Sequence, residues 1–305
     1  MEDVLIIGGG PAALAASVYL ARQKMKFALI TKDIGGQTLL SSDVENYLGF
    51  HLLDGVELVK KFREHLADYR DQFTMAEGEE VAKLERLDSG GFRATTASKT
   101  YDGKTVLIAT GTIHRQLGVP GEKELYGRGV TYCATCDAPL FRDKTVCIVG
   151  GGNSAMDAAL FTAKYATKVV IVTVNPELRG DDVMQAKIAS DPKISVVVSA
   201  KSVGIEGKEK VTGLRYAGSD GKEQVAPCDG VFIEIGLMPV SGFVDFVAKD
   251  KWSQIVVDKA NATNVEGVWA AGDVTDVTEK QVAVAVGEGS KASLSIIKYF
   301  QTHHA

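Results

Sequence analysis

One local pattern occurs twice in this chain, and the repeat constrains the fold more than any other feature. Each copy reads as an apolar strand, a glycine-rich turn, a helix of small residues and a second apolar strand. The predicted strands are Val4–Ile7 and Phe27–Ile30 in the first copy and Val146–Val149 and Val169–Val172 in the second, and the predicted helices end near Gln23 and Tyr165. Units of this kind build parallel sheets that are covered by helices.

Both turns have the spacing G-x-G-x-x-A, from Gly8 to Ala13 in the first copy and from Gly150 to Ala155 in the second. The first glycine permits a tight turn, the second lets the backbone approach a pyrophosphate, and the small third residue keeps helix and strand close. The helix that follows offers unpaired N–H groups and its positive dipole end to the phosphates. One such motif is weak evidence, but two motifs, each between a strand and a helix, predict two dinucleotide sites.

A β-rich excursion follows each copy and is typical of a three-stranded meander laid on a parallel sheet. The predicted strands are Val81–Leu87, Phe92–Thr96 and Thr105–Ile108 after the first copy, and Ser195–Val198, Val211–Tyr216 and Val231–Ile235 after the second. Near the C-terminus a strand at Val268–Ala270 and a helix from about Gln281 would complete the first unit. We therefore expect an α/β protein of two Rossmann-like, three-layer ββα dinucleotide-binding domains, with residues 114–243 inserted between residues 1–113 and 244–305.

Composition narrows the class of protein further. A chain of 305 residues exceeds one comfortable hydrophobic core, which favours two domains. The formal net charge is −5 and there is no run of basic residues, so nucleic acid is not an expected partner. The apolar stretch near Met1 is too short for the core of a signal peptide, and no stretch approaches a membrane span, so we expect a cytoplasmic protein.

Cys133 and Cys136 are the sharpest chemical signal, because two thiols separated by two residues can close a small disulfide. A zinc site would need two more ligands, and neither Cys147, Cys228 nor the five histidines show ligand spacing, so we predict no metal. A second alternative to a redox pair is that Cys133 and Cys136 take no part in any chemistry. A redox pair just before a nucleotide turn instead suggests an electron path from nicotinamide through flavin to a disulfide. Asp137 is either a proton donor of that pair or a helix cap.

The chain resembles the low-molecular-weight thioredoxin reductase family over nearly its whole length. The resemblance rests on the motifs Gly8–Ala13, Gly35–Gln37, Glu45–Gly49, Ala109–Gly111, Val130–Asp137, Gly150–Ala155 and Ala270–Asp273. The segments Asn175–Leu178 and Gly287–Ser295 are similar to those of the reductase portion of the flavoprotein subunit of bacterial alkyl hydroperoxide reductases.

This resemblance implies an FAD-dependent protein-disulfide reductase with FAD in the first domain and NAD(P)H, together with the cysteine pair, in the second. The FAD-binding positions that it implies are Gly8, Gly10, Pro11, Ala12, Gly36, Gln37, Asn46, Thr110, Gly111, Gly272, Asp273, Gln281 and Val282. It also implies that Cys136 faces the flavin, that Cys133 attacks the partner's disulfide and that Asp137 is the acid. The family further implies a homodimer and a thioredoxin-, glutaredoxin- or peroxiredoxin-linked carrier protein as partner.

For the nicotinamide nucleotide the resemblance implies Gly150, Gly152, Asn153, Ser154, Thr173, Glu177 and Gly236. Members that use NADPH carry a basic cluster after the strand corresponding to Val169–Val172, but here the stretch begins with Thr173 and only Arg179 is basic. We therefore expect NADH to be preferred over NADPH, with Glu177 close to the ribose. Because the chain begins directly at the FAD strand, service to a peroxiredoxin would require a separate thioredoxin- or glutaredoxin-like carrier.

The sequence leaves three other functions open. The disulfide reductase could draw electrons from ferredoxin or another donor instead of a nicotinamide. A flavin reductase acting on ferredoxin, flavodoxin or oxygen would not need the cysteine pair. A redox sensor that binds FAD and signals through the disulfide would not need the second glycine turn.

Overall fold

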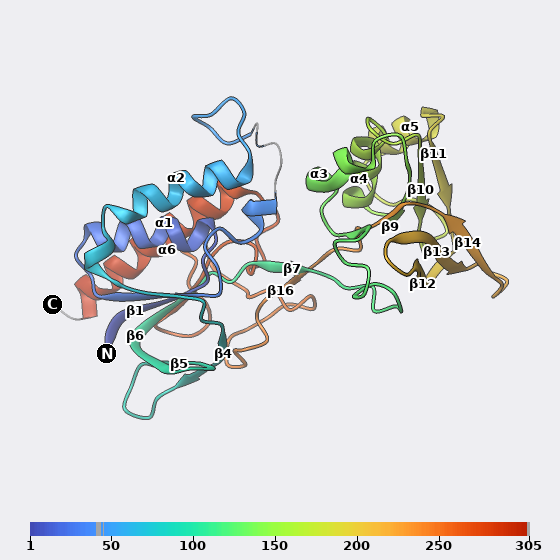
Figure 1. The fold of residues 1–305 in the computed structure, drawn as a ribbon. Helices are drawn as coiled ribbons and strands as arrows, with labels where there is room; N and C mark the ends of the chain where they lie inside the picture. Colours follow the sequence, from blue (N-terminus) through green and yellow to red (C-terminus); the bar gives the residue numbers. More distant parts are fainter. Residues whose placement is uncertain (41–43, 45, 304–305) are drawn as a thin grey trace. The chain divides into compact units, whose positions relative to one another are not determined.

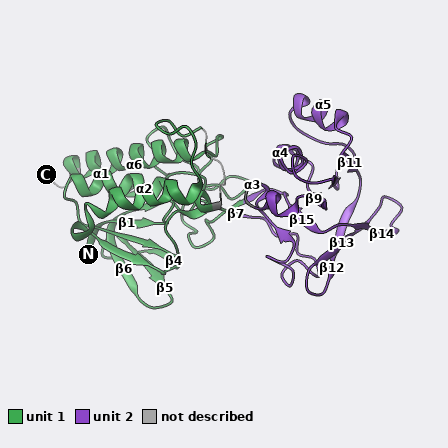
Figure 2. Ribbon diagram, turned by 45° about the horizontal axis from the view of Figure 1, so that its top comes forward, with its two compact units in different colours: residues 1–113, 238–305 green, residues 114–237 purple. Residues whose placement is uncertain are grey.

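The computed structural model describes residues 1–40, 44 and 46–303, and the side chains of residues 40, 135, 136 and 303 lie outside the described part. The chain divides into two compact units, one of residues 1–113 and 238–305 and the other of residues 114–237 (Figure 2). Unit 2 is thus inserted into unit 1. Residues 238–243 join unit 1, although the sequence placed them in the insertion, because Val240 N–H donates to Gly111 O (3.0 Å) and Leu84 N–H donates to Phe243 O (2.9 Å).

The core of unit 1 is one seven-stranded sheet with three helices on one side (Figure 1). Its order is β3-β2-β1-β6-β5-β4, with β17 also paired to β6. The parallel strands are β1 (Glu2–Ile7), β2 (Phe27–Thr31), β3 (Thr74–Glu77), the second half of β6 (Thr100–Ile108) and β17 (Val268–Ala270). The helices are α1 (Pro11–Arg22), α2 (Gly55–Ala67) and α6 (Val282–His303).

Alternation along β1 explains why both faces of this sheet are covered. Val4 and Ile6 face the helices and pack with Leu20, whereas Leu5 and Ile7 belong to the core on the opposite face. That second core is covered by β4 (Val81–Arg86) and β5 (Phe92–Thr96). The predicted meander is therefore present in unit 1, and the first half of β6 is its third strand.

Unit 2 repeats the plan with a five-stranded parallel sheet in the order β11-β10-β9-β15-β8. The strands are β8 (Val130–Thr131), β9 (Thr145–Val149), β10 (Lys168–Val172), β11 (Ile194–Val197) and β15 (Gly230–Ile233). The helices of unit 2 are α3 (Ala134–Asp137), α4 (Asn153–Thr162) and α5 (Asp182–Ser190), with a short 3-10 helix at Ala138–Phe141. Two other 3-10 helices, at Gly36–Leu40 and Arg70–Gln72, belong to unit 1. Two Rossmann-like units therefore make up the chain.

The predicted meander of unit 2 is wrong in its first strand. Ser195–Val198 corresponds to β11, which pairs parallel to β10, and the meander consists of β12 (Lys201–Gly207), β13 (Val211–Ala217) and β14 (Glu223–Pro227). The physical reason is α5, which was not foreseen. A helix between two strands returns the chain for a parallel pairing, whereas a meander needs short turns.

The chain passes between the units twice, at β7 (Thr112–His114) and β16 (Leu237–Pro239), and these two strands pair with each other. Gly111 and Gly236 precede them with positive φ angles of 65° and 99°. Such angles strain any residue with a Cβ, so glycine is needed where the chain turns into each crossing. Among the residues that the structure describes, each helix is too short or too polar to span a membrane.

Candidate active site

The first glycine turn is shaped by close backbone contacts on one side and by open space on the other. Gly8 has a φ of 119°, and a Cβ there would overlap the carbonyl of Ala109. Gly10 differs, because its φ is −77° and a Cβ on it would meet no atom of the described residues within 4 Å. Pro11 then begins α1 without a side-chain cap, so the first N–H groups of the helix are left for another acceptor. This arrangement fits a pyrophosphate.

Other predicted flavin-binding residues gather around this turn. A Cβ on Gly36 would lie 3.6 Å from Gly10 Cα, and a Cβ on Gly272 would lie 3.1 Å from Ala12 Cβ. Unit 1 therefore brings together, at the start of α1, segments that are distant in sequence and that the sequence assigned to one cofactor.

A second group of predicted flavin-binding residues meets near the start of α6. Asn46 Nδ2 donates to Gln281 Oε1 (3.0 Å), although these residues are 235 positions apart in sequence. Val282 lies at the first position of α6, directly after Gln281. Glu45, which begins the motif that contains Asn46, lies outside the described residues.

Two further predicted positions are tied to β7 and to the residue that directly follows β16. Gln37 Nε2 donates to Thr112 O (2.8 Å) and to Thr112 Oγ1 (2.6 Å), and Thr110 Oγ1 donates to Val240 O (2.6 Å). The side chain of Thr110 therefore serves the local fold, since its hydroxyl proton is used within unit 1.

Asp273 lies beside the start of α6 together with two charged residues that sequence reasoning missed. The buried Glu288 accepts a hydrogen bond from Gly272 N–H (2.9 Å), and Lys280 Nζ donates to Asp273 O (3.1 Å). Burial raises the pKa of Asp273, while Lys280 lowers it and Glu288 raises it. The signal for Glu288 was its place between two glycines in the segment Gly287–Ser295, which predicts close packing of the helix backbone.

Replacing Glu288 tests its role as the support of the Gly272 turn. Glu288→Leu should lower the free energy of unfolding by about 1–3 kcal/mol, because a buried N–H then loses its acceptor. Glu288→Gln should lose much less, since the amide oxygen still accepts that bond. Chemical denaturation checks this, with the flavin content of the purified protein as a second readout. Equal losses in the two variants would contradict the role.

The second glycine turn, in unit 2, repeats the geometry of the first. Gly150 has a φ of 145°, and a Cβ there would overlap the carbonyl of Glu234. At Gly152, the one atom of the described residues within 4 Å of a Cβ would be the Arg179 carbonyl oxygen, at 3.9 Å. Helix α4 begins without a side-chain cap, because its N-cap residue is Gly152. Asn153 Oδ1, at the first position of the helix, accepts a hydrogen bond from Asp181 N–H (2.9 Å). The turn is therefore open to a second nucleotide.

The residues predicted near the nicotinamide nucleotide differ in their exposure to solvent. Thr173 is buried and its hydroxyl accepts a hydrogen bond from Asn175 N–H (3.2 Å), so it is poorly placed to bind a ribose. Ser154 and Glu177 are exposed. Arg179, also exposed, donates its backbone N–H to Gly151 O (2.7 Å). The backbone of Arg179 is thus anchored at the second glycine turn, although Arg179 lies well beyond that turn in the sequence.

The cysteine pair lies in unit 2 at α3, between β8 and β9. Cys133 is disulfide-bonded, and its N–H donates to Thr131 Oγ1 (3.1 Å). Cys136 lies in α3, and its side chain is outside the described part. The Asp137 side chain does not cap the 3-10 helix that follows, so the structure does not support the cap interpretation of this residue.

The remaining two cysteines are buried and free. Cys147 lies in β9, and its thiol and that of Cys228 form a hydrogen bond that, together with burial, raises the pKa of Cys147. Both belong to one hydrophobic cluster of unit 2. Within the described part of the chain, no three side chains of His, Cys, Asp or Glu converge as they would around a metal ion.

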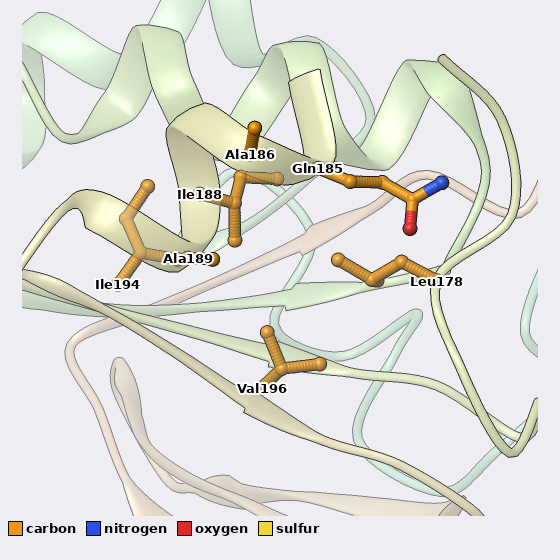
Figure 3. Close-up of a pocket in the computed structure, with 7 residues that line it drawn as sticks. All are labelled: Leu178, Gln185, Ala186, Ile188, Ala189, Ile194 and Val196. Carbon is orange, nitrogen blue, oxygen red and sulfur yellow. The ribbon is translucent and has the colours of Figure 1, made fainter. Parts of the chain in front are cut away.

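A shallow cavity of about 470 Å³ lies between α5 and β11, and neither the glycine turns nor the cysteine pair line it (Figure 3). Its lining is apolar except for Gln185, and includes Leu178, Ile188 and Val196. None of the predicted site residues lines it. It therefore does not define the redox site.

A sequence profile described as pyridine nucleotide-disulphide oxidoreductase matches residues 2–289. The chain belongs to this family. Members of this family combine a flavin with a pyridine nucleotide. The two glycine turns and the disulfide at Cys133 of the present chain are features that such chemistry requires.

Relatives of known name agree with this assignment. A subunit of alkyl hydroperoxide reductase from Pseudomonas putida is 39% identical over 302 residues, which cover 96% of this chain and 57% of that protein. The Staphylococcus epidermidis protein of the same name is 36% identical over 299 residues, covering 97% and 59%. The chain therefore spans less than two thirds of the length of these relatives.

Solved structures of thioredoxin reductases match over the full length of both chains. The thioredoxin reductase of T. acidophilum is 40% identical with a TM-score of 0.82, covering 99% of each chain. Lactococcus lactis thioredoxin reductase is 33% identical with a TM-score of 0.83, covering 98% of this chain and 99% of its own. Among these relatives of the pyridine nucleotide-disulphide oxidoreductase family, the present chain thus has the length of the thioredoxin reductases.

Proposed function

We propose that the chain passes two electrons from NADH, through FAD and a Cys133–Cys136 disulfide, to the disulfide of a thioredoxin- or glutaredoxin-like carrier protein that serves a peroxiredoxin. The single observation that carries the proposal is the combination in one chain of two open glycine turns and a disulfide-bonded Cys133. A flavin reductase needs no disulfide, and a sensor needs no second turn. Unit 1 would hold FAD and unit 2 the nicotinamide nucleotide, in a homodimer.

The residues of unit 1 would position the cofactor rather than react. Gly10 and the first N–H groups of α1 would take the pyrophosphate, and Asp273 a ribityl hydroxyl. Asn46 and Gln281 would stand at the ring, with the positive end of α6 behind Val282. When bound, FAD would supply the two-electron carrier between nicotinamide and disulfide.

The dithiol then acts on the carrier by thiol–disulfide exchange. Cys133 as thiolate attacks one sulfur of the carrier's disulfide and releases the other sulfur as a thiolate. Cys136 next attacks Cys133 in the mixed disulfide, which restores the Cys133–Cys136 bond and frees the reduced carrier. Two electrons pass to the carrier, and two protons follow them. Asp137 is adjacent in sequence to Cys136 and would donate a proton to a departing sulfur.

The choice of nucleotide depends on Glu177 and Arg179, which are both exposed. A single anchored arginine with no basic cluster gives little reason to prefer a 2′-phosphate, so we expect NADH to be used at least about tenfold more efficiently than NADPH. Steady-state kcat/KM with each nucleotide and a thioredoxin-like carrier tests this. Equal efficiencies would remove NADH as the preferred donor.

The variant Arg179→Ala sharpens that comparison. We expect it to leave kcat/KM for NADH unchanged. A large fall for NADPH would show that Arg179 reads the phosphate. Failure of both nucleotides to reduce the flavin would instead favour a ferredoxin-linked donor. A solved structure with a name of this kind is the ferredoxin-flavin thioredoxin reductase of Clostridium acetobutylicum. It is 31% identical with a TM-score of 0.54, and the match covers 99% of this chain and 98% of that one.

A further inference from the structure

Glu122 carries a carboxyl group that is buried in unit 2, on the segment between β7 and β8, and the residue is only 1% exposed. Its Oε1 accepts hydrogen bonds from Leu117 N–H (2.7 Å) and from the Tyr132 hydroxyl group (2.6 Å), and its Oε2 accepts one from Gly118 N–H (2.6 Å). All three partners donate, as the oxygens of a buried carboxylate require. Glu122 therefore ties the backbone at Leu117 and Gly118 to the side chain of Tyr132.

The ring of Tyr132 is held by its neighbours as well. It packs against the hydrophobic cluster of unit 2 that contains the two free cysteines. Its centroid lies 5.8 Å from that of His114, in a stacked arrangement, and 5.7 Å from that of Tyr126. Burial and the hydrogen bond to Glu122 raise the pKa of Tyr132, so its hydroxyl group keeps the proton that it donates. Both the ring and the hydroxyl group of this side chain are thus fixed.

Tyr132 lies in a short joint between the sheet of unit 2 and the helix of the cysteine pair. Strand β8 ends at Thr131, which pairs with Phe232 of β15, and α3 begins at Ala134. Tyr132 and Cys133 are the two residues between these elements. Because each residue of the joint has only two soft backbone dihedral angles, a fixed Tyr132 restricts the position from which the Cys133 side chain leaves the backbone.

We propose that Tyr132 is a positioning residue of the redox pair, whose hydrogen bond to Glu122 holds the backbone at Cys133 in the geometry that favours closure of the disulfide. The inference rests on the proposed function, because it assumes a redox couple of Cys133 and Cys136. It goes beyond that function by assigning part of the equilibrium between dithiol and disulfide to a side chain that carries no sulfur.

The direction of the effect follows from the reaction that opens the disulfide. A thiolate of dithiothreitol attacks one sulfur, and the second thiol of dithiothreitol then displaces the protein sulfur from the mixed disulfide. Two electrons and two protons pass to Cys133 and Cys136, and dithiothreitol becomes a cyclic disulfide. In the reverse direction the two protein sulfurs must meet, which costs less entropy when the backbone beside Cys133 is already fixed. Loss of the Glu122 hydrogen bond should therefore favour the dithiol.

The variant Tyr132→Phe tests this, because it keeps the ring and removes only the hydroxyl group that donates to Glu122. The FAD-loaded protein is equilibrated anaerobically, at one fixed pH, in buffers with different ratios of reduced to oxidised dithiothreitol. Acid quenching, alkylation of free thiols and mass spectrometry then quantify the dithiol form of the peptide that contains Cys133 and Cys136. Since fixing the backbone of one residue corresponds to about tenfold in an equilibrium constant, we expect half-reduction of the variant at an about tenfold lower ratio than in the wild type.

A matched control removes a hydroxyl group from the neighbouring ring. Tyr126 is exposed and lies beside Tyr132, so Tyr126→Phe should leave the ratio at half-reduction unchanged. A purely structural role of Tyr132 would lower the resistance of Tyr132→Phe to chemical denaturation and leave that ratio as in the wild type, and this result would overturn the proposal. An equal shift in Tyr126→Phe would overturn it as well.

The variant Glu122→Gln changes the same hydrogen bond from its acceptor side. An amide oxygen accepts the Tyr132 proton more weakly, because a charged acceptor binds a donor roughly twice as strongly as a neutral one. We expect a shift in the same direction as that of Tyr132→Phe, but a smaller one. If Tyr132→Phe does not fold, this variant decides, since a wild-type ratio at half-reduction in Glu122→Gln refutes the proposal.

The same titration separates this inference from the function on which it rests. If the wild-type peptide is alkylated at both Cys133 and Cys136 even in the most oxidising buffer, no disulfide forms between them, and the proposed function fails. If the wild type titrates between disulfide and dithiol but Tyr132→Phe titrates at the same ratio, only the role of Tyr132 fails.

Discussion

A chain carrying Gly10→Val is expected to fold but to retain less than about one hundredth of its FAD. Gly10 has an ordinary φ of −77°, and within the part of the chain that the structure describes a Cβ on it meets no atom within 4 Å, so valine costs the fold little. The same side chain would fill the space in front of α1 where the pyrophosphate must approach the backbone. Loss of several kcal/mol of cofactor binding is the natural result, which is about a hundredfold or more. The measurement is the flavin-to-protein ratio after purification, with circular dichroism as the check on folding.

The corresponding change in unit 2 is the matched control. Gly152→Val is equally tolerated, with the Arg179 carbonyl 3.9 Å from the new Cβ. It should keep full FAD and lose reduction by NADH, while dithionite still reduces the flavin. Retention of FAD by Gly10→Val, or loss of FAD from Gly152→Val, would show that the two turns do not bind the cofactors assigned to them. Gly8→Val has no such value as a test, because a Cβ there overlaps Ala109 and damages the fold itself.

Serine at either position of the cysteine pair should lower the reduction of a carrier's disulfide by at least about a thousandfold, because the exchange needs both sulfurs. Flavin reduction by NADH should survive in both variants, since the glycine turns are untouched. The single variants differ in one further respect. Cys136→Ser leaves Cys133 able to attack but unable to be released, so it should accumulate a mixed disulfide with the carrier, whereas Cys133→Ser should not.

A buried cysteine provides the control for this pair. Cys228→Ala removes a free thiol of unit 2 and should keep carrier reduction within about twofold, at a cost in stability of about 1 kcal/mol for the lost packing. Non-reducing electrophoresis detects the trapped complex of Cys136→Ser. Undiminished carrier reduction in Cys133→Ser would contradict the assignment of the attacking sulfur.

The sequence predicted those parts of the fold in which local pattern and tertiary role coincide. Buried parallel strands are continuous apolar runs, so β1, β9 and β10 were visible, and the glycine turns carry their own spacing. Helix α5 was missed because its only buried side chain is Ile188. It therefore shows no apolar stripe, and its absence from the prediction turned β11 into a meander strand.

The functional residues also divide into those that a local sequence pattern reveals and those that it does not. Residues within a motif, such as Gly10 and Cys133, were found, because the motif describes their surroundings. Glu288 was not found, because its importance depends on a partner distant in sequence, Gly272. The glycines on either side of it indicate close packing of the helix backbone, but they do not distinguish a buried hydrogen-bond acceptor from a solvated charge.

The most direct test of the proposed electron path counts electrons. Anaerobic titration of the purified yellow protein with dithionite should consume two electrons for the flavin and two more for the disulfide in each subunit, and the Cys133→Ser variant should consume only the two of the flavin. NADH should reach the same end point in the wild type. A wild-type protein that takes up no more electrons than its Cys133→Ser variant would show that the cysteine pair exchanges no electrons with the flavin, and would contradict the central claim.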